Sequence, residues 1–195
     1  MKKERDFFID PRLSAAQCIS LVPVETVHQN LWFTVRNRKG YYTIEDNMSQ
    51  VAILPIVDNE AIIMVRVFRP IIMDNTLEVP AGGAKGTESP VEAAARELSE
   101  ETGITIGDLS RFEMLPPLIY SLRSPLLPYI FKIDLTKEEF RSRKAHDNEI
   151  MSVECFSFDE IVGKIATGEI YIGLQIAVIT RYLILNQSLK LITSS

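Results

Sequence analysis

Glutamates crowd a short stretch of the chain that ends at Glu101. Glu97 lies three residues before Glu100 and four before Glu101, so an α-helix places the three carboxylates on neighbouring faces. Such a run is ordinarily a solvated acidic face, but like charges at this spacing destabilise a helix, and Arg96 is the basic residue among them. Carboxylate oxygens clustered on a rigid backbone are the ligands that a hard divalent cation prefers. The stretch therefore predicts a metal site, with Mg²⁺ as the leading ion because it pairs with substrate phosphates.

The same stretch carries the signals of a helix that would hold these side chains. Ser89 can cap the helix, Pro90 suits its first turn, and Glu92 completes a capping box. Gly103 supplies a C-terminal stop. The spacing predicts a helix over 90–102 whose apolar side packs on a sheet through Val91, Ala94, Ala95 and Leu98.

Most of the remaining chain is predicted to form β-strands, with short alternating pieces up to about Glu45 and again at 150–158. Strands are predicted at 20–27, 31–37, 40–46, 48–57, 61–71, 76–82, 111–121, 126–135 and 150–158, with hairpin turns at 36–40 and 58–60. Helical spacing is found at 157–170 and 173–187. Many strands and few helices indicate an α/β sandwich, a mixed sheet with helices packed on it, rather than a series of βαβ units. We expect a β-rich N-terminal extension over 1–45 and one domain over 46–195.

Composition bounds the partners and the compartment. The chain has 195 residues and a formal net charge of −5, so no broad positive field would attract nucleic acid. Cys18 and Cys155 form no CxxC pair, and with two histidines the chain is not expected to bind zinc; a reduced, cytoplasmic setting is the simplest expectation. No signal-peptide run follows the basic N-terminus, and the apolar stretches are too short or too interrupted to span a bilayer, so we expect no membrane insertion.

One pattern within the glutamate-rich stretch is specific. Gly82, five residues, Glu88, seven residues and then RELSEETGI at 96–104 resemble the Nudix box at every defined position. The resemblance implies the α/β/α sandwich of that family and a hydrolase that cleaves a diphosphate linking a nucleoside to another group. Within the box, Gly82 and Gly83 are expected to give the turn before the helix its backbone freedom.

The resemblance also implies a metal centre. The implied ligands of Mg²⁺, for which Mn²⁺ is the alternative ion, are Glu97 and Glu101 as principal ligands, Glu100 as a further or water-mediated ligand, and the backbone carbonyl of Ala81. Arg96 would hold the carboxylates in place through ion pairs, and Glu88 would anchor the helix or loop. Bound Mg²⁺ would neutralise the diphosphate, orient it and lower the pKa of an attacking water.

The segment VRVFRPIIMDNTLEVPAGG at 65–83 is similar to the corresponding part of the ADP-ribose pyrophosphatase and nucleotide-sugar branch of the family. Phe68 and Arg69 match an aromatic-arginine pair of that branch. Arg69 is therefore a candidate contact for a substrate phosphate or carboxylate, the alternative being a surface arginine at a strand end. Glu78 occupies a position that contributes to substrate or metal binding in that branch.

A second segment, DNEIMSVECFSFDEI at 147–161, also resembles that branch. Asp147 and Glu149 fall where the branch carries acidic residues on a mobile loop, one of them a catalytic base. Glu149 is the first choice for a base that accepts a proton from the attacking water, and Asp147 is the second. The alternative is a polar turn that precedes a strand.

The chain departs from the branch between the box and this loop. ADP-ribose pyrophosphatases usually carry a Ser-Pro-Gly turn there, whereas this chain reads PPLIYSLRSPLLPYIF, without glycine. Tyr120, Arg123 and Ser124 are the candidate substrate-binding residues of this loop. Trp32 and Phe33 could stack on a base, the alternative being a place in the core or in an interface.

These observations lead to one leading function and several alternatives. The leading function is Mg²⁺-dependent hydrolysis of ADP-ribose, or of a related nucleoside diphosphate sugar, to a nucleoside monophosphate and a sugar phosphate. Another diphosphate such as GDP-mannose, NADH or a dinucleoside polyphosphate is the nearest alternative. A nucleotide-binding module without catalysis is another, although a pure binder has no need of the full carboxylate set. By resemblance, the N-terminal extension is expected to form a homodimer.

Overall fold

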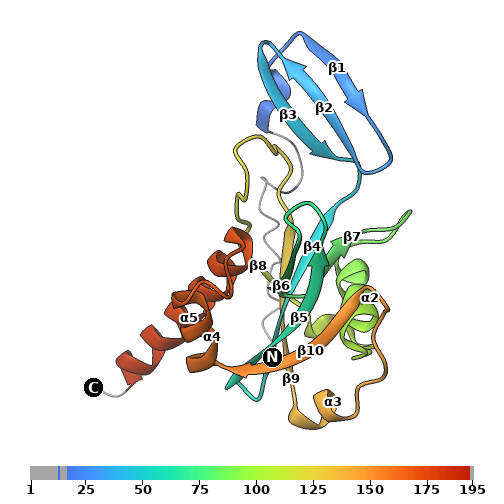
Figure 1. The fold of residues 1–195 in the computed structure, drawn as a ribbon. Helices are drawn as coiled ribbons and strands as arrows, with labels where there is room; N and C mark the ends of the chain where they lie inside the picture. The colour runs from blue at the N-terminus through green and yellow to red at the C-terminus, as the bar shows by residue number, and fades with distance from the viewer. Residues whose placement is uncertain (1–12, 14–16, 194–195) are drawn as a thin grey trace, which may run out of the picture.

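The computed structural model describes Leu13 and residues 17–193, the side chains of 17 and of 187–193 excepted. A seven-stranded sheet lies between α2 (Pro90–Thr102) on one face and α4 (Phe158–Ala166) with α5 (Gly173–Thr193) on the other (Figure 1). The predicted α/β/α sandwich with a mixed sheet is confirmed.

The large sheet is organised around β4. Its strands are β4 (Gln50–Val57), β5 (Ala61–Arg69), β6 (Asp74–Glu78), β7 (Ala81–Gly83), β8 (Glu113–Leu115), β9 (Tyr129–Leu135) and β10 (Ile150–Ser157). They lie in the order β10-β5-β4-β9-β8, with β6 paired to β5 and β7 paired to β4. β4 runs parallel to β9 and antiparallel to β5 and β7. The sheet is therefore mixed.

Successive side chains of β4 point to opposite sides of the sheet, and both sides are covered by helices, so both faces of β4 are buried. One apolar cluster joins the sheet to α2 and includes Val51, Ile53, Ile63, Ala93, Ala94, Leu98 and Phe131. The other joins the sheet to α4 and α5 and includes Ala52, Leu54, Ile56, Ile62, Ile161, Val178 and Ile179. Burial of each large aliphatic side chain stabilises the fold by about 1.5–3 kcal/mol. The first cluster fixes the position of α2 against the sheet, and the second fixes α4 and α5 on the opposite face.

The helix α2 begins and ends where the sequence predicts. The Ser89 hydroxyl accepts from the Glu92 N–H, and the Glu92 carboxylate accepts from the Ser89 N–H at 2.8 Å, which completes the capping box. Gly103 adopts a left-handed φ of 74° and donates its N–H to the Ser99 carbonyl at 3.0 Å. Of the predicted apolar side, Ala94 and Leu98 are fully buried, together with Ala93.

A separate three-stranded antiparallel sheet precedes the sandwich and lies at the top of Figure 1. It consists of β1 (Val24–Gln29), β2 (Phe33–Arg38) and β3 (Tyr41–Asp46). The turn between β2 and β3 places Lys39 at a φ of 52° and Gly40 at 92°, as a tight hairpin requires. Several of its large apolar side chains are exposed: Val24, Val27, Tyr41, Tyr42 and Ile44.

Some predicted boundaries were wrong. The strand expected over 111–121 is reduced to Glu113–Leu115, because Pro116 and Pro117 cannot donate to a ladder. The strand expected over 76–82 is split between β6 and β7. The structure adds the short helix α3 (Lys137–Arg141) and two 3₁₀ turns, η1 (Gln17–Ser20) and η2 (Leu109–Arg111).

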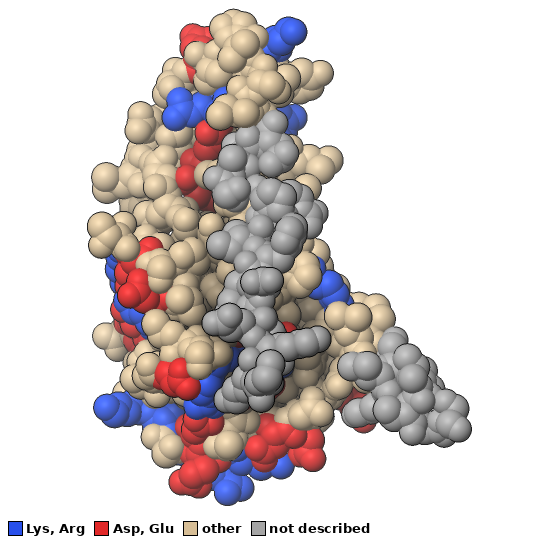
Figure 2. Space-filling view, turned by 180° about the vertical axis from the view of Figure 1, so that it is seen from behind, with Lys and Arg blue, Asp and Glu red and all other residues tan. Residues whose placement is uncertain are grey.

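On the face seen in Figure 2, basic side chains are scattered among acidic ones. Among the helices that the structure describes, none is both long enough and apolar enough to cross a membrane.

Candidate functional site

A cleft of about 500 Å³ opens beside α2, β7 and the end of β5. Its lining brings together the charged side chains Arg69, Lys85, Glu97, Glu100, Glu101, Asp147 and Glu149. The rest of its lining consists of Trp32, Met48, Val67, Ala81, Gly82, Gly83 and Ile150. Residues that lie far apart in the sequence, from the box, from β5 and from the loop before β10, therefore meet at one place.

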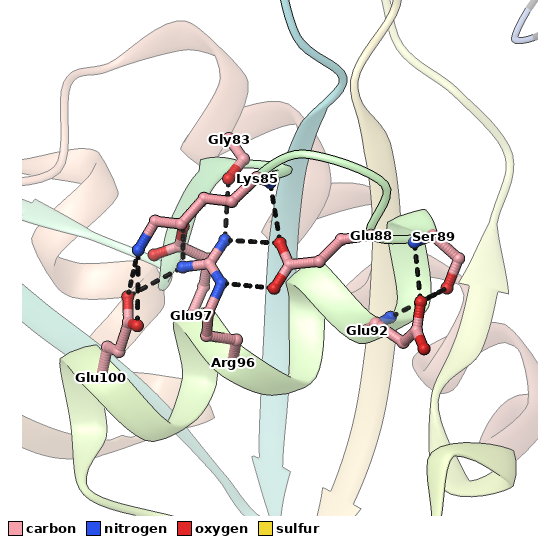
Figure 3. A network of polar contacts seen from close by, with 8 residues as sticks. All are labelled: Gly83, Lys85, Glu88, Ser89, Glu92, Arg96, Glu97 and Glu100. Atoms are coloured by element: carbon pink, nitrogen blue, oxygen red, sulfur yellow. Dashed lines mark hydrogen bonds and ion pairs between the residues drawn. The ribbon is translucent and has the colours of Figure 1, made fainter.

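Arg96 holds the carboxylates of this cleft (Figure 3). Its Nε and Nη2 donate to the two oxygens of Glu88 at 2.8 and 3.1 Å. Its Nη1 donates to Glu97 Oε1 and to Glu100 Oε2, both at 2.8 Å, and Nη2 also donates to the Gly83 carbonyl at 2.8 Å. The hydrogen bonds from Arg96 lower the pKa of Glu88, and those to Glu88 and Glu97 raise the pKa of Arg96. The guanidinium thus offsets the repulsion that the sequence spacing implied.

Glu101 is half-buried near the C-terminal end of the helix, whereas Glu97 is buried. Its Oε2 accepts from the Ala81 N–H at 3.0 Å. Burial raises the pKa of Glu101 to about 8, the Ala81 hydrogen bond opposes the rise, and the neighbouring charge of Glu97 adds to it. Arg69 lies near enough to lower this pKa in part. A cation placed against Glu101 would favour its ionised form.

Gly82 and Gly83 were expected to give a turn its backbone freedom, but this expectation was wrong. Their role is to let neighbouring side chains lie close to the backbone. Both lie in β7, which pairs with β4, and neither has a positive φ. A Cβ on Gly82 would overlap the Glu97 carboxylate, and a Cβ on Gly83 would overlap the side chain of Met48. The absence of a side chain at 82 is therefore what allows Glu97 to lie against the backbone of β7.

The oxygen donors of the cleft suit a hard divalent cation. Among the residues that the structure describes, no three His, Cys, Asp or Glu side chains converge as ligands of one ion. Glu97 Oε2 and Glu100 Oε1 lie outside the Arg96 contacts, and Glu101 and Ala81 supply further oxygens. Mg²⁺ keeps several waters and needs only one or two carboxylates, with substrate phosphates as other ligands. Oxygen-only donors in this cleft fit such an ion.

An ion pair with Glu78 orients the guanidinium group of Arg69. Its Nε and Nη2 donate to the two Glu78 oxygens at 2.6 and 2.8 Å. The Glu78 carboxylate also accepts from Thr76 Oγ1 at 2.6 Å and from Gln175 Nε2 at 3.4 Å. Glu78 is buried and supports Arg69 without lining the cleft, whereas the half-exposed Arg69 does line it.

Gln175 is a site-supporting residue that the sequence analysis missed. It is buried on α5, and its Oε1 accepts from the Val79 N–H at 3.0 Å. One signal was available, because a glutamine within the apolar run GLQIAV is unusual on a helix face that packs against a sheet. Gln175 connects α5 to the Arg69–Glu78 pair.

The loop that carries Asp147 and Glu149 is attached to the end of α2. The Asp147 N–H donates to the Glu100 carbonyl at 2.7 Å, and the Lys144 N–H donates to the Gly103 carbonyl at 2.9 Å. A Cβ on Gly103 would overlap the Lys144 backbone, so this glycine is needed for the crossing as well as for the helix stop. Both carboxylates are exposed at the cleft.

The predicted substrate loop lies elsewhere. Arg123 and Ser124 line a second cavity of about 570 Å³, between this loop and the N-terminal sheet. The Arg123 carbonyl accepts from the Ile44 N–H at 2.8 Å, and the buried Ser124 hydroxyl donates to the Leu126 carbonyl at 3.1 Å. Tyr120 contacts Ser124 at 3.2 Å. Within one chain, these side chains do not join the acidic cleft.

The two candidate aromatic residues separate in the structure. Trp32, in the turn between β1 and β2, lines the acidic cleft and is 66% exposed. Phe33 is half-buried, with its ring 5.9 Å from that of His28. Trp32 is thus the aromatic surface available to a ligand in the cleft.

Comparison with known proteins agrees with this fold and site. Residues 46–172 match the model of the NUDIX domain. The chain belongs to the Nudix family, whose enzymes generally use a divalent metal ion.

Individual relatives match over shorter segments. The chain is 43% identical over 61 residues to the ADP-ribose pyrophosphatase of Bacillus subtilis (strain 168); the aligned segment covers 31% of this chain and 33% of the relative. It is 40% identical over 78 residues to the ADP-sugar pyrophosphatase of Mus musculus, covering 37% and 34%. It is 37% identical over 83 residues to phosphatase NudJ of Escherichia coli (strain K12), covering 43% and 52%. The matches thus span about a third to a half of the relatives' length.

Proposed function

We propose that the protein is a Mg²⁺-dependent hydrolase of ADP-ribose or a related nucleoside diphosphate sugar. The products are a nucleoside monophosphate and a sugar phosphate. The observation that carries the proposal is the single cleft in which the box carboxylates, Arg69 and the Asp147–Glu149 loop meet. The names of two relatives, an ADP-ribose and an ADP-sugar pyrophosphatase, support the substrate class.

The chain's own residues divide the chemistry between binding and proton transfer. Glu97, Glu100, Glu101 and the Ala81 carbonyl would hold Mg²⁺, with Mn²⁺ as the alternative ion. When bound, the ion neutralises the diphosphate and lowers the pKa of an attacking water. Arg96 keeps the carboxylates in position through its hydrogen bonds to Glu97 and Glu100.

Proton transfer is assigned to the loop before β10. Glu149 accepts the proton of the attacking water, and Asp147 is the second candidate. The Asp147 N–H bond to the Glu100 carbonyl supports this role, because it keeps the loop at the cleft. Glu149→Gln should lower kcat by at least about 100-fold with little change in KM, and Asp147→Asn should have a smaller effect. An unchanged kcat in Glu149→Gln would remove it from this role.

Substrate contacts are assigned to both sides of the cleft. Arg69, fixed by Glu78, leaves Nη1 outside the Glu78 contacts to bind a phosphate oxygen. Trp32 stacks on the base. Arg123 and Ser124 would meet the substrate only across a homodimer, in which 1–45 of one copy lies beside the 46–195 domain of the other. The exposed apolar side chains of β1 and β3 support such an interface.

A release assay tests the function. Candidate substrates are ADP-ribose, GDP-mannose, NADH and a dinucleoside polyphosphate, each offered with Mg²⁺ and with a chelator. We expect Mg²⁺-dependent release of a nucleoside monophosphate from ADP-ribose or another sugar nucleotide. Turnover of a different diphosphate alone would change the substrate class. Binding without turnover of any compound would favour a nucleotide-binding module instead.

A further inference from the structure

Lys85 lies at the rim of the cleft, and none of the roles assigned above uses it. It belongs to the loop between β7 and α2, and its side chain is 65% exposed. Its Nζ lies 3.3 and 3.4 Å from the two carboxylate oxygens of Glu100 (Figure 3). The ammonium group therefore shares a proposed metal ligand with Arg96.

Arg96 binds Glu100 more strongly than Lys85 does. Arg96 Nη1 lies 2.8 Å from Glu100 Oε2, and the Arg96 side chain is only 18% exposed and tied to Glu88 as well. The Lys85 contacts are longer, and most of its side chain is in solvent. If a third cation binds Glu100, the Lys85 contact can break with a smaller loss of free energy than the Arg96 contact.

The backbone of Lys85 is nevertheless fixed. Its N–H donates to Glu88 Oε2 at 2.8 Å, and its carbonyl accepts from the Glu88 N–H at 3.1 Å. Because Glu88 is itself bound by Arg96, the loop is anchored to the same network as Glu97 and Glu100. Loss of the Lys85–Glu100 contact therefore requires only rotation of the Lys85 side chain, while the loop stays in place and Arg96 keeps its bond to Glu100.

The charges of the bound ligands determine the position of the Lys85 side chain. A divalent cation held by Glu100 would share that carboxylate with the ammonium group, and like charges at separations of about 4 Å repel each other by more than thermal energy even in water. A diphosphate in the cleft brings negative oxygens that attract the same group. We propose that Lys85 is a displaceable counter-ion, which competes with the divalent cation for Glu100 in the free protein and contacts the diphosphate when both ligands are bound.

The consequence is cooperative binding of cation and nucleotide. Lys85 opposes the cation when the nucleotide is absent and helps to hold the nucleotide when the cation is present. By linkage, each ligand then raises the affinity for the other by the same factor. This role rests on the proposed function for the nature of the two ligands.

Direct measurement of Mn²⁺ binding by electron paramagnetic resonance tests the proposal without any turnover. Lys85→Met removes the charge, and Lys85→Arg keeps it. Lys137→Met is the matched control, because Lys137 is 53% exposed and pairs with Glu60 at 2.9 Å away from the cleft. Each protein is titrated alone and with the α,β-methylene analogue of ADP-ribose.

In the absence of the analogue, Lys85→Met should bind Mn²⁺ about two- to fivefold more tightly than the wild type, the value of one exposed ion pair. The analogue should raise Mn²⁺ affinity more in the wild type than in Lys85→Met. Lys85→Arg and Lys137→Met should behave as the wild type. Equal or weaker Mn²⁺ binding by Lys85→Met would overturn this role alone. Failure of the wild type to bind Mn²⁺ would overturn both this role and the proposed function.

Discussion

Substitution of Gly82 by alanine should damage the site, whereas the same change at Gly83 should not. The new Cβ at 82 would overlap the Glu97 carboxylate, which Arg96 holds at 2.8 Å. Apolar contacts settle at about 3.5–4 Å, so the carboxylate must retreat by on the order of 1 Å. At Gly83 the overlap is with the flexible end of Met48, which can rotate away.

The expected magnitudes follow from this difference. Forced overlap in a packed site costs about 1–3 kcal/mol of unfolding free energy, and a 1 Å displacement of a catalytic group lowers kcat about 100-fold. Gly82→Ala should show both effects. Gly83→Ala should lose less than about 1 kcal/mol and keep its activity within a few fold.

Urea unfolding and kinetics with ADP-ribose and Mg²⁺ measure these quantities on the two variants and the wild type. Mn²⁺ affinity of Gly82→Ala should fall in parallel with kcat. If Gly82→Ala proves as active as Gly83→Ala, the close approach between β7 and Glu97 is not what positions that carboxylate.

Three further outcomes are expected. Arg96→Lys keeps the positive charge but loses the planar guanidinium. The free energy of unfolding in urea should therefore fall by about 2 kcal/mol, and kcat should fall with it. Wild-type values would contradict the proposed role of the Arg96 hydrogen bonds. The Arg111 guanidinium holds the pKa of Glu139 at about 2, below its usual 4.5, so this pair stabilises the fold above about pH 4.5 and its contribution is lost as the pH falls toward 2. Both side chains are about a third exposed, so the stability gap to Arg111→Gln should be about 1 kcal/mol at pH 6 and should narrow as the pH falls toward 2; a constant gap would contradict the shift. Trp32→Ala should raise KM for ADP-ribose about tenfold with little change in kcat, while Trp32→Phe keeps most of the affinity; an unchanged KM in Trp32→Ala would remove the stacking contact.

Local signals made the helix at the site predictable. Ser89, Glu92 and Gly103 set the ends of α2 through hydrogen bonds within a few residues, and the structure reproduces both ends. Apolar runs joined by a tight polar turn likewise predicted β4 and β5, and alternation predicted β10, because these strand signals are local to each segment.

Long-range packing decided what the sequence could not show. Arg123 and Ser124 follow the loop onto the N-terminal sheet, where Ile44 binds the backbone of Arg123. Gln175 reaches Glu78 only because α5 folds back over β6, a contact across almost a hundred residues. Lys85 was unremarkable in sequence, and its meaning comes from the distance to Glu100. The motif predicted which carboxylates gather and that Arg96 pairs with them, but not that Lys85 also contacts Glu100.

The most direct test of the central claim compares Glu101→Gln with Glu92→Gln in AMP release from ADP-ribose. Both substitutions lie on α2, but Glu101 lines the cleft, whereas Glu92 belongs to the capping box, which glutamine can also complete. With Mg²⁺ restored after chelator treatment, we expect Glu92→Gln to match the wild type and Glu101→Gln to lose activity by several orders of magnitude. Equal rates in the two variants would contradict the assignment of the cleft as the metal-dependent site of hydrolysis.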